Sequence, residues 1–106
     1  MMDKTIQSII RAFLLDYPRR NTIAAEVGTI GNKNDRASIS AFMAWNERID
    51  KALTVIDEPL RVGMFQDIAN GTGYHKSTLR KHLTTRHYYT AKNKVLESLA
   101  RELNLI

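Results

Sequence analysis

Apolar side chains recur every three or four residues along most of this chain, and this spacing most limits the folds it can adopt. Residues 5–17 carry one such series, and residues 36–56 and 91–104 carry two more. This spacing lines up apolar groups on one side of an α-helix, whereas no segment shows the alternation typical of a strand. The sequence therefore predicts an all-α fold.

Prolines, glycines and capping residues divide the chain into a compact bundle of about five or six helices. Asp3 is expected to cap a first helix that Pro18 ends, and Pro59 is expected to end a long helix that starts near residue 36. Shorter helices are expected at 22–28, 64–70 and 75–83, and Thr90 is expected to cap the last. Residues 31–35 are predicted to form a loop and residues 60–63 a connector.

The stretch IANGTGYHKSTLRKHL, residues 68–83, has the pattern of a helix-turn-helix. Ala69 is small enough for a second helix to cross close over it. Gly73 is expected to adopt the left-handed backbone that follows a helix end. Leu79 and Leu83 lie one helical turn apart and would face the core, leaving basic and hydroxyl groups outside.

These residues resemble the DNA-reading segment of the tetracycline-repressor family. The match covers Ile68, Ala69, Gly73, Lys76, Thr78 and Leu79. The chain departs from the family pattern at Tyr74, His75, His82 and Leu83. The resemblance spans about a fifth of the chain and is not expected to extend to the family's ligand-binding domain, so it implies sequence-reading DNA contact and says nothing about a small-molecule ligand.

Basic residues gather in the second half of the chain. Residues 1–58 hold eight Lys and Arg against eight Asp and Glu, whereas residues 59–106 hold eight against three. No acidic residue lies between Asp67 and Glu97. Such an excess is typical either of a solvated face or of a polyanion-binding surface, and its coincidence with the motif favours the second.

A helix in the major groove needs donors and acceptors near its N-terminus and cations beside it. Lys76, Ser77 and Arg80 are therefore the predicted base contacts, with Arg80 as the guanine reader because its fork can bond two acceptors. Predicted contacts to the DNA backbone are Thr72, Tyr74, His75, Lys81, Arg86, Lys92 and Lys94. The backbone contacts would hold register without reading sequence.

The sequence gives little support to other chemistry. His75, His82 and His87 have no cysteine or carboxylate near them in the sequence to complete a metal site. Arg86, His87 and the two following tyrosines are residue types used in tyrosine recombination, but the other catalytic elements are missing. We expect no enzymatic activity, no metal and no cofactor.

The prediction is a single helical domain over residues 1–106 that regulates transcription by binding double-stranded DNA, and that a phage or plasmid could encode. Residues 1–58 would form a scaffold or dimerisation half and residues 59–106 the basic half. The absence of cysteine, of a membrane span and of a signal peptide favours a cytoplasmic protein. A homodimer is expected because one recognition helix reads too few base pairs for useful specificity. A protein-interaction factor, such as an antirepressor or assembly adaptor, and an RNA-binding module are the alternatives.

A second, degenerate helix-turn-helix over residues 22–43 is a weaker hypothesis. Ile23, Ala24 and Gly28 repeat the spacing of Ile68, Ala69 and Gly73. An ordinary short helix followed by a loop explains the same residues. Trp45 is expected to pack half-buried rather than stack on a base, because Glu47 and Asp50 beside it would repel phosphate.

Overall fold

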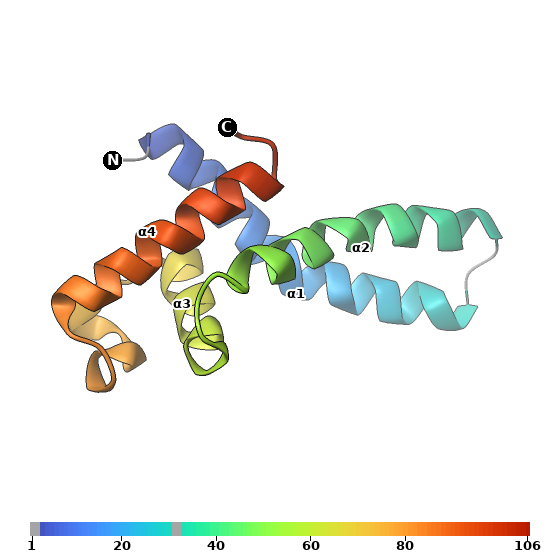
Figure 1. The fold of residues 1–106 in the computed structure, drawn as a ribbon. Helices are drawn as coiled ribbons and strands as arrows, with labels where there is room; N and C mark the ends of the chain where they lie inside the picture. The colour runs from blue at the N-terminus through green and yellow to red at the C-terminus, as the bar shows by residue number, and fades with distance from the viewer. Residues whose placement is uncertain (1–2, 31–32) are drawn as a thin grey trace.

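Four α-helices and two short 3₁₀ segments make up the structure, a computed structural model that describes residues 3–30 and 33–106 (Figure 1). Within these ranges it places all side chains except those of residues 24, 26–30, 33–39, 41 and 42. The helices are α1 (Lys4–Ile30), α2 (Lys33–Leu53), α3 (Glu58–Asn70) and α4 (Thr85–Glu102), and the 3₁₀ segments are η1 (Tyr74–Lys76) and η2 (Thr78–Lys81). The described part is all-helical, as predicted, but has fewer and longer helices than the five or six expected.

Helices α1 and α2 form an antiparallel hairpin that projects from the rest of the molecule (Figure 1). The prediction that Pro18 ends the first helix is wrong: α1 continues through it to Ile30 and includes the separate helix expected at 22–28. Asp3 does cap α1, because its carboxylate accepts a hydrogen bond from the Thr5 amide at 2.6 Å. The predicted loop at 31–35 lies partly outside the described residues, and from Lys33 onward it is helix.

A cluster of polar side chains bonds carbonyls of α1 just before the proline. Arg20 donates to the Phe13 carbonyl and to the Asn46 side-chain oxygen, both at 2.6 Å. Asn46, on α2, in turn donates to the Tyr17 carbonyl at 3.1 Å and to the Asn21 side-chain oxygen at 2.9 Å. Proline removes a backbone donor and distorts the turn before it, so side chains that bond the nearby carbonyls offset part of that cost. We call Arg20, Asn21 and Asn46 the Arg20 cluster.

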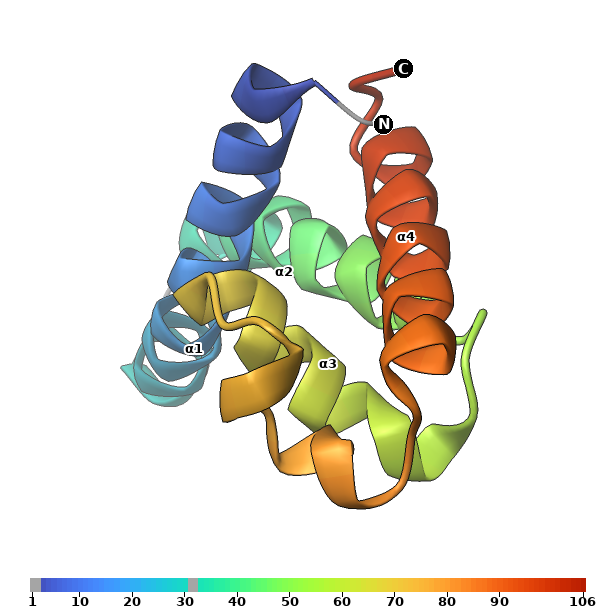
Figure 2. The same ribbon diagram turned by 90° about the vertical axis from the view of Figure 1, so that its left-hand side faces the viewer.

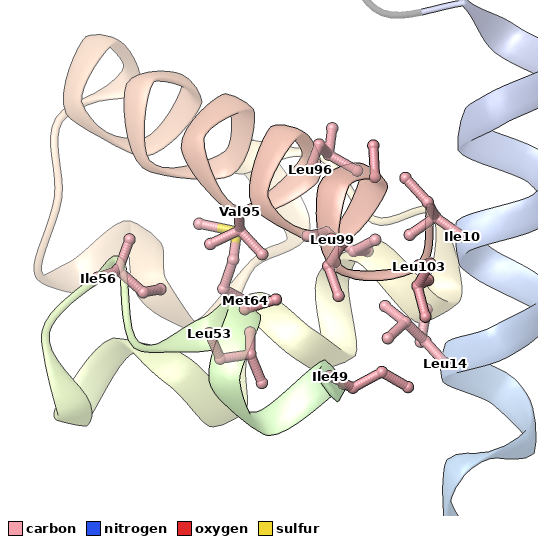
Figure 3. Packing of buried hydrophobic residues seen from close by; sticks show 14 of the residues in the cluster. Ile10, Leu14, Ile49, Leu53, Ile56, Met64, Val95, Leu96, Leu99 and Leu103 are labelled. Atoms are coloured by element: carbon pink, nitrogen blue, oxygen red, sulfur yellow. The ribbon is translucent and has the colours of Figure 1, made fainter. Parts of the chain in front are cut away.

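The hydrophobic core joins the first half of α1 to the end of α2 and to α3 and α4 (Figure 3). Leu14, Ile49, Met64 and Leu99, one from each helix, are fully buried within it. Leu14 on α1 and Leu99 on α4 belong to the same core, so the core joins the first helix of the chain to the last. Figure 2 shows these two helices as neighbours. Trp45 is half-buried as expected and packs against the Phe13 ring, with 5.1 Å between the ring centroids.

Helix α3 begins earlier than the sequence suggested. Pro59 was expected to end the preceding helix, but α2 stops at Leu53 and Pro59 instead stands in the first turn of α3. Proline suits a first turn because its missing N–H would have no helical partner there. The predicted connector at 60–63 is consequently helical. Gly63 lies where Leu79 packs on α3: a Cβ there would stand 2.8 Å from the Leu79 Cδ2 atom.

The turn after α3 is made by Gly71 and not by Gly73, which corrects the prediction. Gly71 has φ +67°, in the left-handed region. Its amide donates to the Ile68 carbonyl at 3.4 Å and the Thr72 amide to the Asp67 carbonyl at 2.8 Å, the pairing of a Schellman motif. Gly73 is extended, with φ −92° and ψ 178°, and makes no special demand on its residue type.

The predicted second helix of the motif, residues 75–83, is not an α-helix. Two 3₁₀ turns, η1 and η2, take its place, with Ser77 in an extended conformation between them. The Ser77 hydroxyl donates to the buried Asp67 carboxylate and accepts from the Leu79 amide at 3.0 Å. A serine that bonds the backbone in this way competes with a continuous helix. Leu79 is buried and Leu83 half-buried, as predicted, although on a different backbone.

Helix α4 also starts earlier than expected. Thr84, and not Thr90, is its cap: the Thr84 hydroxyl accepts from the His87 amide at 3.2 Å. Thr90 instead lies inside the helix, with its hydroxyl on the Arg86 carbonyl at 2.9 Å. Residues 85–90, which lie between the two expected helices at 75–83 and 91–104, are therefore the first turns of an 18-residue helix. Among the described residues no helix is both long and apolar enough to cross a membrane.

Candidate nucleic-acid interface

Segment 71–84 is held against α3 and α4 by a buried carboxylate. Asp67, on α3 and only 5% exposed, accepts hydrogen bonds from the hydroxyls of Ser77 and Tyr88, the latter at 2.9 Å. Tyr88, on α4, is fully buried, and its hydroxyl also lies 3.3 Å from the Thr72 carbonyl. Burial, and then the bond to Asp67, raise the pKa of Tyr88 far above its ordinary value. We call Asp67, Ser77 and Tyr88 the Asp67 cluster.

This arrangement gives Ser77 a structural position that excludes the predicted base contact. Its side chain is 7% exposed, and its hydroxyl already bonds Asp67 and the Leu79 amide. A base edge could reach it only if both bonds broke. The serine orients the segment from inside and does not present a group to a partner.

Tyr74, a predicted backbone contact, also lies mainly inward. Its hydroxyl donates to the Leu83 carbonyl at 2.9 Å, and its ring lies 5.5 Å from the Tyr88 ring. Its amide lies 3.4 Å from the Tyr89 hydroxyl. These contacts attach η1 to the first turns of α4, so the two elements lie side by side.

Exposed cations remain on the outer side of the 3₁₀ turns. Lys76, Arg80 and Lys81 are exposed, as is His75, whose carbonyl accepts from Arg80 at 3.3 Å. The three cations form no ion pair with any carboxylate that the structure describes. Their charge is therefore available to an anionic partner, although no helix presents it to a groove.

Helix α4 supplies the helical surface that segment 75–83 lacks. Its first turns expose Arg86, His87, Thr90, Asn93 and Lys94. Arg86, Thr90 and Asn93 follow the i, i+4, i+7 spacing that lines up side chains on one helix face. They provide donors and acceptors together, and the helix N-terminus adds a partial positive charge. Farther along this side lies the exposed ion pair of Glu97 and Arg101.

Two more predicted backbone contacts, Thr72 and Lys92, take part in internal contacts. The Lys92 ammonium donates to the Thr72 carbonyl at 3.3 Å and lies 5.9 Å from the ring centres of both Tyr88 and Tyr89. Both residues are half-buried. Lys92 consequently points to a different side of α4 from Thr90, because the two positions are separated by a little over half a turn.

Of the ten predicted contacts, seven lie on the exposed surface of segment 75–81 and α4. Six are exposed: His75, Lys76, Arg80, Lys81, Arg86 and Lys94; the seventh, Lys92, is half-buried and only its remaining surface is accessible. Thr90 and Asn93 are the candidate residues that the sequence reading left out. A cap placed at Thr84, three residues before His87, would have brought both onto an exposed helix face.

No family model, no curated protein and no solved structure matched the chain. The part of the chain that the structure describes also holds no group of three or more His, Asp or Glu side chains able to bind a metal ion. The geometry of the exposed basic surface is therefore the basis for assigning a function.

Proposed function

We propose that the protein binds double-stranded DNA and regulates transcription by occupying its site. One observation carries the proposal: the exposed face of Arg86, Thr90 and Asn93 at the start of α4, beside the unpaired cations of η1 and η2. The major groove of B-DNA admits an α-helix, and the protein distinguishes base pairs through side chains on that helix. Helix α4 offers such groups directly beside the unpaired cations of η1 and η2.

The proposed roles divide between reading and holding. Arg86 and Asn93 read base edges, because a guanidinium bonds guanine at two acceptors and a carboxamide bonds adenine in the same way. Lys76, Arg80 and Lys81, on the neighbouring 3₁₀ turns, contact phosphates and set the register. Lys94 adds a phosphate contact from α4 itself. This revises the sequence-based assignment of Lys76 and Arg80 as base readers, because they no longer stand on a helix.

A homodimer belongs to the same proposal. One helix start reads only a few base pairs, and two copies related by a two-fold axis double the sequence information. The selected site is then expected to be a palindrome whose half-sites lie about one helical turn apart.

Selection of bound sites from random duplexes, followed by affinity measurements, tests the proposal. An enriched palindrome is expected, and its affinity should fall steeply with salt. Four phosphate contacts per copy give a slope of about −4 per copy in a plot of log affinity against log salt concentration. Asn93→Ala should cost about 1 to 3 kcal/mol on the selected site and relax preference at one base pair, whereas Lys81→Ala should weaken all duplexes alike.

Arg19→Ala is the matched control for the cation substitutions. Arg19 lies on the exposed side of α1 near Asp16, and its loss should leave duplex binding unchanged. No enriched motif and no duplex binding at low salt would reject the proposal and favour an acidic protein partner for the same surface.

A further inference from the structure

A second basic site lies away from the start of α4, between α1, the end of α3 and the middle of α4. It is a pocket of about 290 Å³, and Lys4, Arg11 and Lys92 contribute cations to its lining. No acidic residue is among those that line it. Three positive charges around one small volume raise the local concentration of anions.

Each cation has donors to spare. The Arg11 Nε atom donates to the Ala69 carbonyl at 2.9 Å, and one terminal nitrogen lies 3.4 Å from the Asn70 carbonyl. A guanidinium has five N–H donors, so its other terminal nitrogen remains for a ligand. Lys92 uses one of three donors on the Thr72 carbonyl, and Lys4 forms no ion pair with any described carboxylate.

The carbonyls at the end of α3 hold two of these cations in place. Arg11 bonds the last carbonyls of α3, and Lys92 bonds Thr72 in the turn that follows. A helix C-terminus carries partial negative charge, which stabilises both cations without neutralising them. The site is therefore preorganised: an anion would meet cations that are already positioned, with Ser8 supplying a hydroxyl donor beside them.

The bottom of the pocket is apolar. Ile68 and Leu96 line it, and both are almost fully buried. The volume lies at the lower end of the range for small-molecule sites, which excludes a long polymer but admits a phosphate group with a short organic part. Phosphate accepts hydrogen bonds on several oxygens at once, which matches donors that come from both α1 and α4.

We propose that this pocket binds a small phosphorylated molecule, held by Lys4, Arg11 and Lys92. The site is separate from the proposed DNA surface, because Lys92 and Leu96 lie on the other side of α4 from Thr90. The proposal does not depend on duplex binding, and its main test uses a small phosphate compound in place of DNA.

Inorganic pyrophosphate is the probe, titrated into the isotope-labelled protein at constant ionic strength while the backbone amide signals are followed by NMR. Saturable shifts are expected at Gly71 and Thr72, which border the pocket. Lys4→Gln and Lys92→Gln should each raise the dissociation constant about tenfold, the effect of one charge-assisted hydrogen bond. Arg101→Gln is the matched control on α4, because Arg101 does not line this pocket, and it should leave the constant unchanged.

Two outcomes would overturn the proposal, and a third would reject only the proposed DNA function. Shifts that do not saturate, or that weaken equally in all three variants, would mean general charge screening and would overturn the proposal. If pyrophosphate causes no shift at Gly71 while a DNA duplex does, the three cations hold backbone phosphates of the duplex and the small-molecule site is refuted. Loss of duplex binding with saturable pyrophosphate binding would reject only the proposed DNA function.

Discussion

The Arg20 cluster and the Asp67 cluster are both buried polar groups, but they affect the backbone in opposite ways. Arg20 and Asn46 bond the carbonyls of Phe13 and Tyr17, just before Pro18, and α1 stays helical where a proline would be expected to end it. Asp67 bonds the Ser77 hydroxyl, and the segment after α3 departs from a helix that its apolar spacing predicted. In both places the buried hydrogen bonds accompany a backbone path that local sequence rules do not predict. The rule is the proline rule in α1 and the apolar spacing in the segment after α3.

The two clusters also differ in what they support. The Arg20 cluster joins α1 to α2 in the part of the molecule that leads into the projecting hairpin. The Asp67 cluster joins α3, segment 71–84 and α4, the elements that carry the exposed basic surface. If this distinction is right, damage to the first should affect stability alone, and damage to the second should affect stability and duplex binding together.

The largest effect is expected from Asp67→Ala. The substitution removes the acceptor of two buried hydroxyls, and hydrogen bonds to a charged group contribute about 1.5 to 3 kcal/mol each. The free energy of unfolding, measured by urea denaturation, should fall by about 3 to 4 kcal/mol, and duplex binding should weaken as well. Asp57→Ala is the control, because Asp57 is exposed and makes no side-chain cap to α3. Equal stability of the two variants would mean that the carboxylate does not hold the segment.

Asn46→Ala tests the other cluster. It leaves the Arg20 guanidinium and the Tyr17 carbonyl without their Asn46 partners in a buried place, and we expect a loss of about 2 to 3 kcal/mol. Duplex affinity of the folded variant should stay within about twofold of the original, since stability changes without disturbing α4. Asn93→Ala should show the reverse: stability within about 0.5 kcal/mol and lower affinity for the selected site. A loss of binding in Asn46→Ala would show that the two regions are coupled.

Two glycines two residues apart allow a sharper test of segment 71–84. Gly71→Val forces a β-branched residue into a left-handed backbone, with a new Cβ about 3.3 Å from the Arg11 Nη1 atom, and should cost about 1 to 3 kcal/mol. Gly73→Val should cost less than about 1 kcal/mol, because its backbone is extended and its Cβ would meet the Tyr89 hydroxyl at an ordinary 3.5 Å. Thermal melting of the two variants gives the comparison, and a larger loss at Gly73 would contradict this turn geometry.

The helical class of the fold could be predicted from the sequence because it depends on apolar spacing, which the core preserves. Ile10, Leu14, Ile49 and Leu99 all came from predicted apolar stripes and are fully buried. The helix ends could not be predicted in the same way. Local sequence rules predict that a helix ends at Pro18. The side chain that bonds the Tyr17 carbonyl, just before the proline, belongs to Asn46, which lies 28 residues after Pro18 in the chain.

The candidate site was predictable in charge but not in shape. The run without acidic residues from 68 to 96 gave the exposed cations directly. The position of these cations in the fold depends on Asp67 and Tyr88. In the sequence, Asp67 stood out only as the boundary of that run, and Tyr88 lay between two expected helices. A buried carboxylate bonded to two hydroxyls produces no regular spacing of residue types in a sequence. The change from a helix to two 3₁₀ turns could therefore not be predicted.

The smallest effect concerns the pH dependence that Tyr88 gives the Asp67 cluster. Because burial and the bond to Asp67 raise the pKa of Tyr88, the fold favours the neutral phenol, and this stabilisation is complete below the unfolded pKa of about 10 and is lost as pH rises above it. The loss approaches about 1.4 kcal/mol per pH unit, and it reaches about 1.4 kcal/mol by pH 11. Tyr88→Phe should be less stable at pH 8 but should lose about 1.4 kcal/mol less than the original protein between pH 9 and pH 11 in urea unfolding, because other groups titrate equally in both. Parallel pH profiles would mean that the Tyr88 phenol ionises as readily in the fold as in the unfolded chain, and that the Asp67 cluster is open to water.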